Sequence, residues 1–160
     1  MTVEIAAPTE TGTERPHNED TVYAERLEDS ALLAVADAMG GHRAGDVASQ
    51  GAVDIFSKTV QTAEMDDDKK RLTEAVAAAN DYLQELVAEE PELEGMGTTL
   101  VAALVRGETA TIVNAGDSRA YHATDNGIEQ VTTDQSLVGR RSRRRNSRMS
   151  NFFSHRQRMV

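Results

Sequence analysis

The sequence contains no cysteine among its 160 residues. This absence excludes disulfide bonds, thiolate metal sites and cysteine nucleophiles. Any bound metal ion must therefore be held by oxygen or histidine ligands. Such a donor set favours magnesium, manganese or calcium over structural zinc.

Long apolar runs are also missing. No stretch of 18 or more apolar residues occurs, so the sequence predicts no transmembrane helix. Residues 1–10 lack the basic start and the long apolar segment of a signal peptide, and we therefore expect a cytoplasmic protein. The length is typical of a single domain.

Basic residues are scarce over most of the chain and abundant at its end. Residues 1–138 hold all 27 acidic residues and nine of the 17 basic ones, which gives a net charge of −18. Residues 139–160 hold eight arginines and no acidic residue. An acidic, lysine-poor surface repels nucleic acid and anionic membranes, and it is typical of halophilic proteins, in which salt screens the self-repulsion. An ordinary acidic cytoplasmic protein is the alternative interpretation.

Hydrophobic periodicity predicts strands on both sides of a pair of helices. Apolar residues at helical spacing predict one helix from about Gly45 to Val60 and a second from Leu72 to Val87. Short apolar or alternating runs bounded by turn residues predict strands at residues 3–7, 21–27, 31–36, 98–107, 109–116, 118–124 and 127–132. This order indicates an α+β fold with helices packed on antiparallel sheet.

The strand predicted at residues 31–36 is wholly apolar and ends in Asp37. Such a run fits a strand buried on both faces, and a carboxylate at its end is costly to bury without a partner. Gly40, Gly41 and Gly45 follow, and they allow a tight turn or a close approach of backbone to a ligand. The partner of Asp37 is a metal ion in one interpretation, and Asp37 opens a turn or caps a helix in the other.

Two further motifs carry acidic residues beside predicted strands. "RPHNED" contains Arg15, Glu19 and Asp20, and "NAGDSRAY" contains Asp117. Carboxylates at several strand ends can converge on divalent cations, and an arginine nearby can bind a phosphate through two charge-assisted hydrogen bonds. Each motif alone is typical of a turn. Together they predict a metal site that acts on phosphate.

Five motifs in this order resemble the metal-dependent serine/threonine protein phosphatases of the PP2C (PPM) type, in particular their prokaryotic branch. They are R-x-x-N-E-D, A-D-x-M-G-G-H-x-x-G-x-x-A-S, G-M-G-T-T-L, G-D-S-R-A-Y and T-x-D-Q-S, within residues 3–138. The resemblance implies a four-layer α-β-β-α sandwich. It also implies hydrolysis of phosphoserine and phosphothreonine in proteins that a serine/threonine kinase has modified. We expect no membrane and no nucleic acid as partner, because the acidic surface repels both.

The resemblance further implies a site for two Mn²⁺ or Mg²⁺ ions. Asp37 would bridge the two ions, and the backbone carbonyl of Ala38 would bind one of them. Glu19 and Asp20 would face the same site, directly or through coordinated waters.

Arg15 would hold the substrate phosphate, and Asp117 would lie near a weaker third metal position. The implied reaction is attack of a metal-activated water on the phosphate ester, without a phosphoenzyme. Met39 stands where some relatives carry a histidine that could act as a general acid, and we assign no catalytic role to His17 or His42.

Hydroxyl residues near these motifs have simpler interpretations. Gly97, Thr98 and Thr99 form a glycine turn before a strand rich in β-branched residues, and we expect them to pack rather than to take part in the chemistry. Ser118 and Ser136 have no adjacent base that would make either one a nucleophile.

The chain departs from the family pattern at two places. Ala38 replaces a glycine, and we predict that a Cβ there weakens metal binding if the residue needs a positive φ or a close approach of its backbone to the ion. After residue 138, where the family continues to further metal ligands, this chain has its arginine-rich segment. We therefore expect a partial phosphatase domain at residues 1–138, incomplete at its C-terminus, and a disordered tail at residues 139–160.

Three origins of this tail remain open: a nucleic-acid-binding arm, a solvated extension, and an out-of-frame continuation of a phosphatase gene. We favour the last, because a shifted frame across codons for acidic residues readily encodes arginine. Without the distal ligands, the chain is expected to have impaired activity. The alternative is a non-catalytic module, a pseudophosphatase that binds phosphoproteins.

Overall fold

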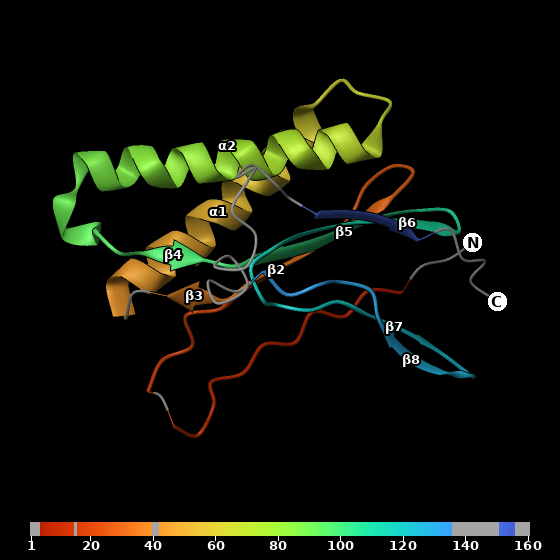
Figure 1. The fold of residues 1–160 in the computed structure, drawn as a ribbon, viewed down its shortest axis with the longest axis horizontal. Coiled ribbons are helices and arrows are strands. Elements are labelled where there is room, and N and C mark those ends of the chain that lie inside the picture. The colour runs from red at the N-terminus through yellow and green to blue at the C-terminus, as the bar shows by residue number, and fades with distance from the viewer. Residues whose placement is uncertain (1–3, 15, 40–41, 136–150, 156–160) are drawn as a thin grey trace.

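The computed structural model describes residues 4–14, 16–39, 42–135 and 151–155 (Figure 1). Two long helices, α1 (His42–Thr62) and α2 (Asp68–Glu89), pack against each other and against one face of an antiparallel sheet (Figure 1). The strands of this sheet lie in the order β1 (Thr21–Arg26), β2 (Ala31–Ala36), β5 (Leu100–Arg106), β6 (Thr109–Ala115) and β9 (Asn151–His155). The predicted α+β class is therefore confirmed.

Two short ribbons extend this framework. Strand β3 (Ala38–Met39) continues from β2 and pairs with β4 (Gly97–Thr98), which follows the 3₁₀ helix η1 (Pro91–Leu93). Strands β7 (Tyr121–Thr124) and β8 (Gly127–Gln130) form a hairpin that projects from the main sheet (Figure 1). The β3–β4 ribbon, which directly follows Asp37 in the chain, packs beside α1 (Figure 1).

The core lies between the helices and the sheet. Alternate residues of β2, among them Leu32 and Ala34, face Phe56 of α1 and Leu72 of α2, and the side chains of Leu32, Phe56 and Leu72 are fully buried. Burying one such side chain stabilises the fold by about 1.5–3 kcal/mol. Leu104 of β5 completes this layer, which fixes the sheet against both helices.

The opposite face of the sheet is also apolar. The register places Ala24, Leu33, Ala103 and Ile112 in one row across β1, β2, β5 and β6. In the neighbouring row Val35 is 40% exposed. Both described helices pack on the other face, so this face has no helical cover within the described residues. Strands that are apolar on both sides are typical of a sheet that packs against a second layer.

The predicted helices are confirmed, and both begin earlier than the apolar pattern alone indicates. Helix α2 starts after Asp67, whose carboxylate accepts hydrogen bonds from the backbone N–H groups of Lys69 and Lys70 at 2.9 and 3.2 Å. Such a cap stabilises a helix by about 1 kcal/mol. Neither helix in the described part of the chain combines the length and the apolar character needed to span a bilayer.

Two segments differ from the sequence predictions. Residues 4–7, part of the strand predicted at residues 3–7, are not in a strand, because no described strand supplies the other half of a hydrogen-bond ladder. In the segment expected to be a disordered tail, residues 151–155 form β9, which pairs with β6 in a register that sets Phe153 opposite Ile112. The other residues from 139 onward lie outside the described residues, and the disordered tail stays a prediction for them.

Candidate metal site

Asp37 lies at the junction of β2 and β3, and its backbone is hydrogen-bonded on both sides of the residue. Its N–H donates to Thr99 Oγ1 at 3.1 Å. Its carbonyl oxygen accepts from the N–H of Thr99 at 2.9 Å and from the hydroxyl of Thr98 at 3.1 Å. The carboxylate-bearing side chain is exposed. These contacts hold the backbone in place, whereas the side chain stays accessible to solvent.

Thr99 connects Asp37 to a third motif. Its side chain is buried, and its Oγ1 lies 2.5 Å from Ser118 Oγ, next to Asp117 in the chain. Gly116 has φ +113°, and a Cβ there would lie 2.7 Å from Thr99 Cγ2. The packing predicted for Thr99 is therefore confirmed, and hydrogen bonds to Asp37 and Ser118 accompany it. We refer to Thr98, Thr99 and Ser118 as the hydroxyl clamp.

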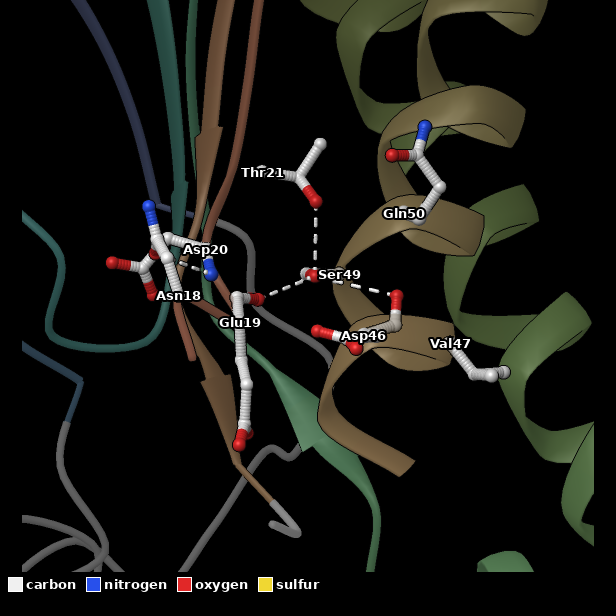
Figure 2. Close-up of a pocket in the computed structure, with 8 residues that line it drawn as sticks. All are labelled: Asn18, Glu19, Asp20, Thr21, Asp46, Val47, Ser49 and Gln50. Atoms are coloured by element: carbon white, nitrogen blue, oxygen red, sulfur yellow. Dashed lines mark hydrogen bonds between the residues drawn. The ribbon is translucent and has the colours of Figure 1, made fainter. Parts of the chain in front are cut away.

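Glu19 and Asp20 lie directly before β1, beside helix α1. Ser49 of α1 donates a hydrogen bond to the carbonyl oxygen of Glu19 at 2.7 Å and accepts one from the hydroxyl of Thr21 at 2.9 Å (Figure 2). The N–H of Asp20 donates to Asn18 Oδ1 at 3.1 Å. Glu19 is half-buried, and its side chain extends away from Ser49 (Figure 2).

A cavity of about 420 Å³ opens at this contact between β1 and α1. The residues that line it are Asn18, Glu19, Asp20, Thr21, Asp46, Val47, Ser49 and Gln50. Three of them are acidic, which makes the cavity attractive to cations and repulsive to anions. Asp37 is not part of this lining.

The carboxylate of Glu19 lies against the first turns of α1. A Cβ built on Gly45 would stand 2.2 Å from Glu19 Oε2 and 3.4 Å from the Cβ of Ala38. Glu19 thus reaches from the start of β1 toward the ribbon that follows Asp37. Ala38 itself lies in β3, where an extended backbone suits alanine, so the positive-φ argument for weakened metal binding does not apply.

The donor chemistry suits a hard divalent cation, but the ligand set is incomplete within the described residues. Carboxylate oxygens and a backbone carbonyl are the ligands that Mn²⁺ and Mg²⁺ prefer. Within residues 4–14, 16–39, 42–135 and 151–155, however, no three His, Asp or Glu side chains stand close enough together to hold one metal ion. The predicted phosphate ligand, Arg15, lies outside the described residues.

Asp117 lies in the loop between β6 and β7, where it is exposed. The loop is held at Arg119, whose Nε and Nη2 donate to the two carboxylate oxygens of Asp134 at 2.8 and 2.6 Å. The hydrogen bonds from Arg119 hold the pKa of Asp134 below its ordinary value. Asp117 is next in the chain to Ser118, whose hydroxyl forms the hydrogen bond with Thr99 in the hydroxyl clamp.

The sequence predictions missed the residues that support these carboxylates. Ser118 was considered only as a nucleophile, Gly45 only as allowing a tight turn or a close approach of backbone to a ligand, and Ser49 only as part of a motif. One local signal does point to them: Gly45 lies inside a helix, where glycine is unfavourable, and Ser49 follows four residues later on the same face.

The comparisons with known proteins agree with this geometry. The family model described as "Protein phosphatase 2C" matches residues 9–160. The serine/threonine protein phosphatase PstP of Mycobacterium tuberculosis is 41% identical over 144 residues, which are 86% of this chain and 26% of that protein. The serine/threonine phosphatase stp of Listeria welshimeri is 40% identical over 136 residues, 81% of this chain and 54% of the relative.

Solved structures give the same result. The catalytic domain of PstP in complex with two manganese ions superposes with a TM-score of 0.73 at 42% identity, covering 83% of this chain and 56% of that one. Stp1 from Staphylococcus aureus gives a TM-score of 0.78 at 35% identity, covering 88% and 57%. The chain thus spans between a quarter and somewhat more than half of these relatives. It belongs to the protein phosphatase 2C family.

Proposed function

We propose that this chain supplies the N-terminal part of the active site of a PP2C-type serine/threonine protein phosphatase. The observation that carries the proposal is the approach of the Glu19 carboxylate, over Gly45 of α1, to Ala38, the residue after Asp37. The hydroxyl clamp holds the backbone of Asp37 itself. The relatives with this sequence pattern are serine/threonine phosphatases, one of them solved with two manganese ions.

In this proposal Asp37, Glu19, Asp20 and the carbonyl of Ala38 hold Mn²⁺ or Mg²⁺. The ions, when bound, would neutralise charge on the phosphate and lower the pKa of a water molecule, which would make that water a better nucleophile toward the ester. The hydroxyl clamp keeps the Asp37 backbone in one position, so that its carboxylate is oriented before an ion arrives. Arg15 binds the phosphate of a phosphoserine or phosphothreonine, as its place in the motif implies.

Turnover by the 160-residue chain alone is low in this account. A divalent cation takes about six oxygen ligands, whereas the described residues bring no three acidic or histidine side chains together. The test is manganese-dependent release of phosphate from a phosphothreonine peptide, with Asp37→Asn as the matched inactive variant. Robust turnover that Asp37→Asn does not change would refute the proposed site.

A second candidate function follows from the same incomplete ligand set: binding of phosphoprotein without hydrolysis. Phosphopeptide binding that persists at saturating Mn²⁺, with no phosphate released, would favour this pseudophosphatase role. If replacing Arg15 then weakened phosphopeptide binding, the binding would be specific recognition of the phosphate rather than nonspecific association.

The substrates in this proposal are proteins that a serine/threonine kinase has phosphorylated, within a cytoplasmic signalling pathway. The acidic character of residues 1–138 agrees with a cytoplasm of high salt content. A thermal midpoint that rises steadily with added KCl would support the halophilic interpretation. A midpoint that is independent of salt would refute it.

A further inference from the structure

We propose that Gly45 and Ser49 form a cradle on helix α1 that positions the Glu19–Asp20 segment for cation binding. Both are positioning residues, because they act on the segment and not on the reacting atoms. The inference rests on the proposed function, since it concerns carboxylates that this function assigns to the metal site.

The first half of the cradle is a hydrogen bond. The Ser49 side chain is 1% exposed, and its hydroxyl donates to the carbonyl of Glu19 at 2.7 Å while it accepts from Thr21 at 2.9 Å. Its own helix offers only the carbonyl of Asp46 at 3.5 Å, too long for a good hydrogen bond. The buried hydroxyl therefore ties the backbone carbonyl of Glu19 and the side-chain hydroxyl of Thr21 to the helix.

The second half of the cradle is space. A Cβ on Gly45 would meet Glu19 Oε2 at 2.2 Å and Glu19 Cδ at 3.0 Å, so alanine there would displace the carboxylate. Glycine inside a helix is about 1 kcal/mol less favourable than alanine. If the space were empty, Gly45→Ala would stabilise α1. The glycine instead leaves the room that the Glu19 carboxylate occupies.

The two halves act on one residue from one helix face. Residues four apart on a helix are neighbours on its surface, so Ser49 holds the Glu19 backbone while Gly45 admits its carboxylate. Together they direct Glu19 toward Ala38 and the strand end that carries Asp37.

The test is Mn²⁺ affinity of the 160-residue chain, measured from the free-Mn²⁺ electron paramagnetic resonance signal without any activity assay. Loss of supporting contacts around metal ligands typically weakens binding about 10–100-fold, and we expect about tenfold for Gly45→Ala and for Ser49→Ala. Gly45→Ala should leave the thermal midpoint unchanged or higher, because the flexible Glu19 side chain can move aside. A purely structural role would instead lower the midpoint.

Two matched controls come from the same helix. Gly51→Ala places a Cβ 2.6 Å from Tyr82 Cε1 on the side facing α2, so it should change stability and leave Mn²⁺ affinity unchanged. Ser57→Ala removes another buried hydroxyl, which donates to the carbonyl of Asp54 at 3.2 Å, and should behave in the same way.

A double-mutant cycle shows whether Gly45 acts through Glu19. In a Glu19→Ala background, Gly45→Ala should no longer change the Mn²⁺ affinity. Binding by the unmodified chain that neither Gly45→Ala nor Ser49→Ala weakens would overturn the inference alone. Absence of Mn²⁺ binding by the unmodified chain would overturn the proposed function and the role of the cradle with it.

Discussion

The two acidic segments of the candidate site are held in different ways. At Asp37, both backbone polar groups are hydrogen-bonded by the hydroxyl clamp, and the ribbon β3–β4 continues the restraint. At Glu19, one backbone carbonyl is tied to α1 through Ser49, and the side chain is placed by the space over Gly45. The position of the Asp37 carboxylate thus depends on its hydrogen-bonded backbone, whereas the position of the Glu19 carboxylate depends on the packing around its side chain. Mutations around the two should therefore act differently.

The largest effect is expected for Asp37→Asn. Removing the proposed bridging carboxylate should weaken Mn²⁺ binding about 100-fold or more, beyond the effect of losing a supporting contact. The thermal midpoint should stay nearly constant, because the side chain is exposed and the clamp binds the backbone. Isothermal titration with Mn²⁺ measures the affinity. The exposed Asp54 of α1, changed to asparagine, is the control that should leave it unchanged.

Thr99→Val tests the clamp itself. Valine keeps the shape of threonine but removes the hydroxyl that accepts from the Asp37 N–H and bonds to Ser118. Leaving such partners unsatisfied in a buried place costs about 1–3 kcal/mol, which urea unfolding would detect. Thr73→Val, in an exposed position on α2 where the hydroxyl bonds its own helix, should cost much less. Equal losses for the two variants would show that Thr99 only packs.

Asp134 gives a smaller, pH-dependent effect. Its pKa is lowered in the folded state by Arg119, so the pair contributes stability above the ordinary aspartate pKa and loses it as the pH falls through the lowered one. Both side chains are partly exposed, so the effect on stability is small. Arg119→Gln should raise the pKa of Asp134 toward its ordinary value in a carboxyl NMR titration. An unchanged pKa would mean that the bidentate contact does not form in solution.

The sequence predicted the elements that a local pattern of apolar residues specifies. Helical spacing located α1 and α2, and the apolar run at residues 31–36 became β2 with the same bounds. A strand was predicted for residues 4–7 and is not present there, whereas β9 was not predicted. A strand depends on the strand that it pairs with, and a local sequence pattern does not contain that partner. The β3–β4 ribbon was missed for the same reason, since two-residue strands have no periodicity.

Within the site, the motifs located the carboxylates but not their supports. Asp37 stood out because it ends an apolar strand, and Glu19 because it lies in a motif with Arg15 and Asp20 before a predicted strand. The contact between Ser49 and the Glu19 carbonyl joins residues 30 positions apart, and the bond between Thr99 and Asp37 joins residues 62 apart. Such contacts follow from tertiary packing, which the sequence pattern does not specify.

The most direct test of the account is where Mn²⁺ binds on the chain. Paramagnetic Mn²⁺ broadens the NMR signals of nearby nuclei, so substoichiometric Mn²⁺ should first remove the backbone amide signals of residues 19–20 and 37–38. The acidic run at residues 66–68, remote in sequence and rich in aspartate, serves as the internal comparison. Early, selective loss at Glu19, Asp20, Asp37 and Ala38 is the predicted result. Loss that begins at residues 66–68, or that spreads evenly over all acidic positions, would contradict the assignment of the metal site.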